Sequence, residues 1–162
     1  MLLWTGCNNS SRWEHYRAEK HVRDSVGLAD QLRSIDYYQT QLDALLPLAE
    51  SLIALFSYEK NDKYQDHGFY VVKNEKLKIK YYDLRVMVRD DGKELLVYRN
   101  GKRLSNERVN ELKNDGNQAL DRAEHLHIII HDIKELEKRI SQTSLEIQKY
   151  QKRLTNERVT NE

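Results

Sequence analysis

The sequence has little of what usually identifies a functional site. It contains one cysteine, Cys7, among 162 residues, which excludes an internal disulfide and any metal site built from several cysteines. No apolar run approaches the ~18 residues that a membrane-spanning helix needs. The six glycines never fall into GxGxxG or P-loop spacings, so no motif supports nucleotide binding. The net charge is only +1, so the chain as a whole has no strong attraction for nucleic acid or for an anionic membrane.

Proline is equally scarce, with a single residue, and this scarcity suits long helices. Charged residues make up 33% of the chain and hydrophobic residues 39%. This composition is typical of long helices rather than of a compact sandwich of strands. A length of 162 residues corresponds to about one domain. We therefore expect one domain over residues 12–162, preceded by a polar segment at residues 1–11.

The chain opens with MLLWTGCNNSS, in which Gly6 precedes the single cysteine and a polar Asn/Ser run follows it. This segment resembles the end of a bacterial lipoprotein signal peptide. The resemblance implies that Cys7 carries a lipid, that residues 1–11 are a truncated signal with its tether, and that the chain is anchored to the lipid bilayer of the bacterial cell envelope. Because residues 1–6 hold no basic residue, and the apolar stretch after Met1 is three residues long against the ~7–15 of a working signal, the resemblance also implies a start further upstream. The alternative is a frayed N-terminus with an inert thiol, in a cytoplasmic protein.

Residues 12–58 carry a helical pattern. Apolar side chains recur at alternating spacings of four and three, and only Gln39 is polar. The members of this first seam are Leu28, Leu32, Ile35, Gln39, Leu42, Leu46, Ala49, Ile53 and Phe56. Such a heptad pattern predicts a long helix with one apolar stripe. Pro47 removes one backbone hydrogen bond and crowds the carbonyl group of Asp43, so we expect a kink or a break near Leu45.

Residues 105–155 repeat the pattern, and here only Thr143 is polar. The members of this second seam are Leu126, Ile129, Ile133, Leu136, Ile140, Thr143, Ile147, Tyr150 and Leu154. Neither seam is stable in water, because each exposed Leu or Ile side chain forgoes ~1.5–3 kcal/mol of burial. The simplest solution is that the two helical arms pack on each other as an antiparallel coiled-coil hairpin. Self-association through either seam into a homo-oligomer is the alternative.

The segment between the arms, residues 67–104, alternates as strands do. Strands are predicted at Phe69–Val72, Leu77–Tyr81, Leu84–Val88 and Leu95–Tyr98, with a switch of parity between the second and the third. Asp91-Gly92 and Asn100-Gly101 are signals for type I′ hairpin turns. The segment therefore predicts a three- or four-stranded antiparallel meander.

One face of this meander is expected to pack on the second arm near Leu120 and Ile128. The helix around these two residues is apolar nearly all round, which predicts that it is enclosed. The predicted fold class is α+β, mainly α. Two long helices would form an antiparallel coiled-coil hairpin, with a small antiparallel β-meander inserted between them.

A near-repeat occurs at the start and at the end of the second arm: KRLSNERVNE begins at Lys102 and KRLTNERVTNE at Lys152. Ser105 and Thr155 are good N-cap residues, and Gly116 is expected to end or bend the helix that the first copy begins. Two copies do not make a repeat architecture. We interpret the pair as chance or as the remains of a duplication.

The run AEHLHIIIHD is the most site-like segment. Glu124 and His127 are three residues apart and His131 follows four later, and a Glu-x-x-His pair on a bundle helix resembles half of a di-iron carboxylate site. A second Glu-x-x-His is absent, and the three side chains are predicted to point away from the second seam. We therefore expect no metal site, with these residues as weak candidates, and no cofactor. His67 has no cysteine or activated serine beside it and is not expected to be catalytic.

The strand region carries local positive charge, because ten Lys or Arg residues stand against five acidic ones between Lys73 and Arg103. Basic strands with interleaved tyrosines can bind single-stranded nucleic acid or another polyanion. The residues considered for polyanion binding are Lys78, Lys80, Arg85, Arg89, Arg99 and Lys102. The alternative, which we favour, is a solvated strand face on which lysines discourage aggregation.

These observations name no reaction, and we expect no enzyme. The favoured interpretation is a non-enzymatic coiled-coil lipoprotein of the bacterial cell envelope, with a structural role or a role in binding a protein partner that the sequence does not identify. The alternative is a soluble module. In one form, its order of helix, strands and helix resembles prefoldin-type chaperone subunits. In another form, its basic strands bind nucleic acid or another polyanion. A metal-dependent helical enzyme using Glu124, His127 and His131 is the least favoured.

Overall fold

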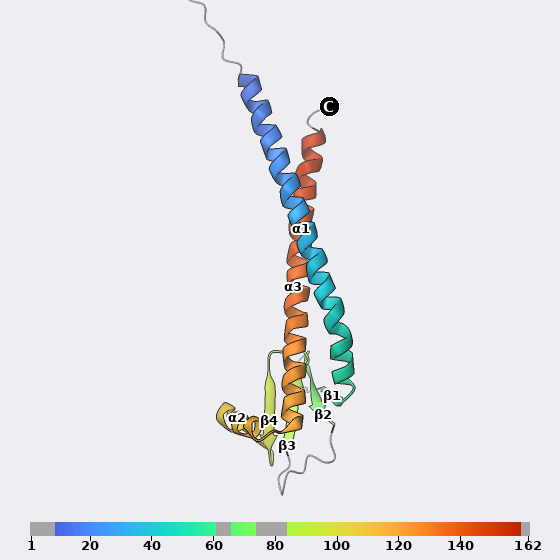
Figure 1. Cartoon of the computed structure of the whole chain (residues 1–162), viewed down its shortest axis with the longest axis vertical. Coiled ribbons are helices and arrows are strands. Elements are labelled where there is room, and N and C mark those ends of the chain that lie inside the picture. Colours follow the sequence, from blue (N-terminus) through green and yellow to red (C-terminus); the bar gives the residue numbers. More distant parts are fainter. Residues whose placement is uncertain (1–8, 61–65, 74–83, 160–162) are drawn as a thin grey trace, which may run out of the picture. The chain divides into compact units, whose positions relative to one another are not determined.

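The computed structural model describes residues 9–60, 66–73 and 84–159. Helix α1 (Asn9–Ile53) comes first, and helices α2 (Asn106–Asn114) and α3 (Gln118–Val159) come last (Figure 1). The strands between them are β1 (Phe56–Lys60), β2 (Gly68–Val72), β3 (Leu84–Arg89), β4 (Leu95–Arg99) and β5 (Lys102–Arg103). The fold class is α+β and mainly helical, as predicted, with the sheet between α1 and α3 in the sequence. Neither long helix, as far as the structure describes it, holds a stretch of the length and hydropathy needed to cross a bilayer.

The chain divides into two compact units, which we describe separately. The helical unit consists of the described residues up to Gln39 and from Arg139 onward. The sheet unit consists of the described residues between Thr40 and Lys138. Each unit takes part of α1 and part of α3.

In the helical unit, α1 and α3 run antiparallel. The contacts join Lys20 to Glu157, Asp24 to Arg153, Gly27 to Tyr150 and Tyr38 to Arg139. Each step forward along α1 is therefore matched by a step back along α3. The interior of this unit is thin and partly polar. Among its described residues, Ile147 is the only buried hydrophobic side chain, beside the buried polar residues Asp24 and Thr143.

The second seam is confirmed as the inner stripe of α3, because all nine of its members are buried or half-buried. The first seam is only half right. The inner stripe of α1 is formed by Asp24, Leu28, Gln31, Ile35, Tyr38, Leu42, Leu45, Ala49 and Leu52, and Phe56 of β1 continues it. Leu32, Gln39 and Leu46, which were predicted to lie inside, are exposed. The predicted and the observed stripes share every second member, from Leu28 to Phe56. The members between these shared positions differ, and spacing alone does not decide which of the two sets faces the interior.

Of the kink or break predicted near Leu45, the break is wrong, because α1 continues through this residue and through Pro47 to Ile53. Leu42 and Ala49, on either side of Pro47, are both buried in the sheet unit. Their packing outweighs the ~3 kcal/mol that a proline costs in a helix interior. Asp43, whose carbonyl group cannot accept a hydrogen bond from Pro47, is exposed, so water can reach this group.

The arm predicted for residues 12–58 is helical only as far as Ile53, and Phe56–Lys60 forms strand β1 instead. Five strands result, each antiparallel to the next along the chain, in the order β1-β2-β3-β4-β5. Phe56 continues the heptad spacing and also begins a strand, so either structure buries it. The predicted strand Leu77–Tyr81 and the parity switch after it lie outside the described residues.

One face of the sheet packs on the first half of α3. Val86, Val88 and Val97 from the strands join Leu120 and Leu126 from α3 in the main hydrophobic cluster, and all are nearly inaccessible to water. The expected contact at Leu120 is thus confirmed. The expected contact at Ile128 is wrong: this side chain is 49% exposed, since it lies off the stripe that faces the strands. The helix here is therefore not enclosed on all sides. A second buried cluster, Phe69, Val71, Met87 and Leu96, occupies the other face of the sheet.

Of the two hairpin turns, the one at Asn100-Gly101 is confirmed as type I′. Both residues have positive φ, and Arg99 pairs with Lys102 across the turn. The prediction at Asp91-Gly92 is wrong, because only Gly92 has positive φ. Arg89 instead bonds across to Glu94, and a longer loop lies between them.

The two copies of the near-repeat adopt different structures. In the first, Lys102–Arg103 is β5, and the Ser105 side chain accepts a hydrogen bond from the backbone N–H of Arg108, which confirms the predicted cap of α2. Gly116 has positive φ and lies just after α2, as expected. In the second copy, where little chain follows Thr155, this residue caps no helix. Thr155 lies inside α3 and donates to the carbonyl oxygen of Gln151.

Candidate binding cleft

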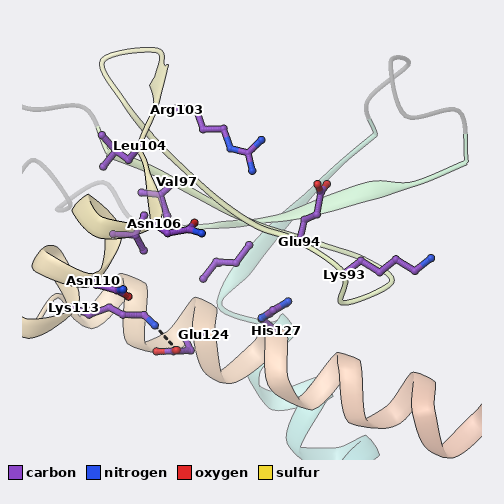
Figure 2. A pocket seen from close by; sticks show the side chains of 12 residues that line it. Lys93, Glu94, Val97, Arg103, Leu104, Asn106, Asn110, Lys113, Glu124 and His127 are labelled. Carbon is purple, nitrogen blue, oxygen red and sulfur yellow. Dashed lines mark hydrogen bonds and ion pairs between the residues drawn. The ribbon is translucent and has the colours of Figure 1, made fainter.

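The sheet unit contains a cleft of about 420 Å³ between β4, β5, α2 and α3. Apolar side chains form its base: Leu95, Val97, Leu104 and Val109. Charged and polar side chains surround this base: Lys93, Glu94, Arg103, Asn106, Asn110, Lys113, Glu124 and His127. Figure 2 shows Asn110 and Lys113 projecting from α2, and Glu124 and His127 from α3.

Two helix caps fix the walls of the cleft. Ser105 begins α2, and the Asn117 side chain accepts hydrogen bonds from the backbone N–H groups of Ala119 and Leu120 at the start of α3. A capping side chain of this kind satisfies amide groups that otherwise have no partner in the helix. Asn117 is itself buried, so the start of α3 is held inside the sheet unit. The caps thereby set where Glu124 and His127 stand.

Glu124 and His127, singled out in the sequence, both line the cleft, but His131 does not. The carboxylate of Glu124 forms an ion pair with Lys113. The Nε2 atom of His127 is buried and has no hydrogen-bond partner among the described residues. His131 is exposed, and its backbone lies against Gly92. No group of three His, Cys, Asp or Glu side chains that could hold a metal ion occurs in the part of the chain that the structure describes.

The charges around the cleft are not balanced. Lys113 is paired with Glu124, and Glu94 lies 3.4 Å from Arg89. The side-chain charges of Lys93 and Arg103 have no acidic partner among the described residues, and both side chains are exposed. An apolar base flanked by two uncompensated cations suits a ligand that combines an apolar group with carboxylates.

The residues considered for polyanion binding do not gather on one face. Arg85 and Arg89 project from the face of β3 opposite to the one that packs on α3, because their neighbours Leu84, Val86 and Val88 belong to the main cluster. Arg99 and Lys102, which are partners in the sheet, have the parity of the face that packs on α3. Lys78, Lys80 and Cys7 lie outside the described residues.

Two of these arginines also have acidic partners. Arg85 forms an ion pair with Glu59 of β1. Arg89 forms two hydrogen bonds with Asp91, at 2.7 and 2.8 Å. The hydrogen bond to Asp91, opposed by partial burial and helped by the charges of Asp91 and Glu94, raises the pKa of Arg89. A cation held in this way is less available to a polyanion, since the partner would have to be displaced.

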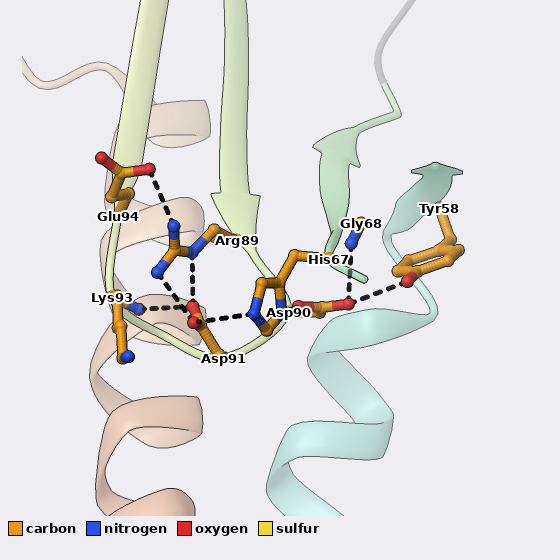
Figure 3. Close-up of polar contacts among 8 residues, drawn as sticks. All are labelled: Tyr58, His67, Gly68, Arg89, Asp90, Asp91, Lys93 and Glu94. Atoms are coloured by element: carbon orange, nitrogen blue, oxygen red, sulfur yellow. Dashed lines mark hydrogen bonds and ion pairs between the residues drawn. The ribbon is translucent and has the colours of Figure 1, made fainter. Parts of the chain in front are cut away.

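A polar network joins the start of β2 to the loop after β3 (Figure 3). Asp90 accepts hydrogen bonds from the backbone N–H of Gly68 and from the hydroxyl of Tyr58, both at 2.8 Å, and lies 3.0 Å from Nδ1 of His67. Partial burial opposes the charge of Asp90, but these hydrogen bonds outweigh it and lower the pKa of this carboxyl group. The same contact raises the pKa of Tyr58, because its proton is held by a carboxylate. His67 is therefore part of a network that links β1, β2 and the loop after β3.

Asp91 fixes the loop itself. Its carboxylate binds Arg89 and accepts a hydrogen bond from the backbone N–H of Lys93 at 3.0 Å. Partial burial opposes its charge, and the hydrogen bonds from Arg89 and Lys93 more than compensate, so the pKa of Asp91 is lowered. The network thereby sets the position of Lys93 and Glu94 at the edge of the cleft.

Reasoning from the sequence found two residues of the cleft and missed the others. Lys113 and Asn110 lie one turn apart on α2, and only the chain reversal at Gly116 brings them opposite Glu124. No spacing in the sequence signals this arrangement, because α2 packs without a single buried residue.

Comparisons with known proteins found no match: no family model fits the chain, and neither a curated protein nor a solved structure is significantly similar to it.

Proposed function

We propose that this chain is a non-enzymatic, partner-binding coiled-coil lipoprotein of the bacterial cell envelope. Cys7 carries the lipid anchor, α1 and α3 pair as an antiparallel coiled-coil hairpin, and the sheet is the insert that meets the partner. The cleft is the observation that carries the binding role. It combines an apolar base with the two exposed cations Lys93 and Arg103, which have no acidic partner among the described residues.

The helical unit supports the coiled-coil part of the proposal. The inner stripes of α1 and α3 follow alternating spacings of three and four, and the contacts between the helices run in opposite chain directions. This is the spacing that coiled coils use to keep one stripe against a partner. The polar members of the stripes include Asp24, Gln31 and Thr143, and such residues fix the pairing of helices rather than strengthen it.

The partner that fits the cleft is a protein segment with carboxylates beside an apolar side chain. The apolar group would cover Leu95, Val97 and Leu104, and the carboxylates would meet Lys93 and Arg103. Nothing in the geometry favours the polyanion alternative, because its described residues are divided between two faces of the sheet and two of them have acidic partners.

The anchor is tested by metabolic labelling with an alkyne-bearing fatty acid, in bacteria that express the chain from its own gene with its natural upstream sequence. We expect the label on the protein and its recovery in the membrane fraction. The C7S variant should carry no label and should leave that fraction. Absence of label on the natural protein would remove the lipoprotein part of the proposal.

The cleft is tested by placing a photo-crosslinking amino acid at Asn110, with the same residue at Asp132 as the control. Both positions are exposed on helices, but only Asn110 lines the cleft. We expect an adduct of one defined mass from position 110, and a large loss of it in the K93E/R103E double variant. No adduct at position 110, or one that survives the charge reversal, would contradict the binding role of the cleft.

A further inference from the structure

The first turns of α1 expose two aromatic side chains side by side. Trp13 is 64% exposed and Tyr16 is 54% exposed. Their rings lie edge to face, with centroids 6.3 Å apart and planes at 87°. Because α1 begins at Asn9, the pair lies close along the chain to Cys7. Two large aromatic groups left in water at one place require an explanation, since single exposed apolar residues are common but clusters usually mark a contact.

Pairing with α3 does not provide that explanation. Among the described residues, α1 meets α3 near its start through Lys20 and His21, which both contact Glu157. Trp13 and Tyr16 precede these two residues in α1, and both remain exposed in the helical unit.

The surrounding charge is positive. Arg12, Arg17 and Arg23 are exposed, and no ion pair involves them among the described residues. Of the acidic residues in this stretch, Glu19 lies 3.5 Å from His15. Residues 12–23 hold four Lys or Arg against two Glu, although the whole chain is nearly neutral. One of the four, Lys20, is paired with Glu157. The start of α1 is therefore more positive than the overall net charge of +1 suggests.

Trp and Tyr rings prefer the boundary between hydrocarbon and water, where the ring is buried and its polar group remains hydrated. Arginine side chains around such rings bind anionic lipid headgroups, at a gain that adds up over several residues. Such a surface contact differs from a membrane span and needs no long apolar stretch. A helix that exposes both groups has the chemistry of a surface that binds a bilayer.

We propose that Trp13 and Tyr16, with Arg12, Arg17 and Arg23, form a contact surface for an anionic lipid bilayer. The biological setting rests on the proposed function, in which the lipid on Cys7 keeps this part of α1 near a membrane. A contact of aromatic and cationic groups would add to the lipid attachment and would orient the start of α1.

The experiment uses the full chain with Cys7→Ser, so that no acyl chain contributes, and with Trp4→Phe, so that Trp13 is the only tryptophan. The probes are phosphatidylcholine vesicles with and without phosphatidylglycerol. We expect the emission of Trp13 to shift to shorter wavelength with the anionic vesicles, and the chain to sediment with them. W13A should lower the affinity for anionic vesicles about tenfold, measured by sedimentation.

Tyr37→Ala is the matched control, because Tyr37 is a similarly exposed aromatic residue of α1, 59% accessible, beyond the cationic stretch. It should bind as the parent chain does. Unchanged emission of Trp13 with anionic vesicles, or equal affinity of the W13A and Y37A chains, would overturn the inference. Labelling of Cys7 reports separately on the anchor. Vesicle binding without acylation would support the contact surface and contradict the anchor. Acylation without vesicle binding would support the anchor and contradict the contact surface.

Discussion

At the scale of single residues, Asp90 links three parts of the sheet unit. Its carboxylate accepts from Gly68 and Tyr58 and contacts His67, so one side chain ties β1, β2 and the loop after β3 together. In D90N the amide group can accept fewer of these bonds and has no charge. We expect the free energy of unfolding near pH 7 to fall by about 1–3 kcal/mol, measured by urea titration.

The pH dependence of that loss follows from the lowered pKa of Asp90. A carboxyl group with a lower pKa in the folded state contributes stability that is complete above its unfolded value of about 3.9 and disappears as the pH falls through the folded value. The difference between the natural protein and D90N should therefore be full near pH 7 and should shrink below about pH 4. Asp132, exposed on α3 and without a contact among the described residues, is the control. D132N should change stability by no more than about 0.5 kcal/mol at any pH.

Both the backbone conformation and a close contact restrict substitution at Gly92, whereas only the backbone conformation restricts it at Gly101. Both have positive φ, but a Cβ atom on Gly92 would lie 2.7 Å from the backbone nitrogen of His131, whereas nothing lies within 4 Å of one on Gly101. G101A should cost about 1–2 kcal/mol for the left-handed backbone alone. G92A should cost roughly 1–3 kcal/mol more, because the backbone of α3 cannot move away as a side chain can. Equal losses in thermal unfolding would show that the loop does not press against α3 in solution.

At the scale of elements, the inner stripe of α1 can be tested with two leucines one turn apart. Leu42 is 9% exposed and Leu46 is 40% exposed, and both were predicted to lie inside. L42A should lower the free energy of unfolding by about 2–4 kcal/mol, since a buried side chain is lost. L46A should cost less than about 1 kcal/mol. The helix propensity changes equally in both, so the difference measures burial. A larger loss for L46A would restore the stripe that the sequence suggested.

The elements also show where sequence reasoning works. The second seam was predicted correctly because the residues that an alternative stripe would use are mostly polar or charged, as at Asp132, Glu137 and Arg139. In α1 the neighbouring pair Leu45 and Leu46 permits two stripes, and the choice depends on packing. Asn100-Gly101 specifies its turn because both residues tolerate positive φ, whereas the loop at Gly92 depends on Asp91 binding Arg89.

The near-repeat shows why the rest cannot be read locally. KRLSNERV and KRLTNERV differ by one methyl group, yet the first forms a short strand and a capped helix start and the second lies within a helix. The first copy follows a type I′ turn that pairs it with β4. The second follows more than thirty residues of helix, which propagates readily once formed. The cleft likewise depends on the surrounding structure, because α2 forms only in the copy that follows β5 and begins at the Ser105 cap.

At the scale of the whole molecule, the two units differ in what holds them together. The sheet unit has a buried cluster on each face of its strands. In the described part of the helical unit, Ile147 is the only buried hydrophobic residue, and the Oδ2 atom of Asp24 is buried without a hydrogen-bond partner. A unit with so little apolar burial opens at a lower free energy than one with a complete core.

We therefore expect hydrogen exchange in increasing urea to separate the two units. Backbone amides of residues 20–35 and 145–157 should exchange through an opening roughly 2–4 kcal/mol below that of the strands β2 to β4. Asp24→Leu supplies the matched variant. It replaces a carboxylate that lacks a full set of partners by an apolar side chain on the inner stripe, and should raise the protection of the helical unit while leaving the strands unchanged. If helices and strands instead exchange with the same dependence on urea, and Asp24→Leu shifts them together, the chain unfolds as one cooperative body and the thin interior of the helical unit does not govern its stability.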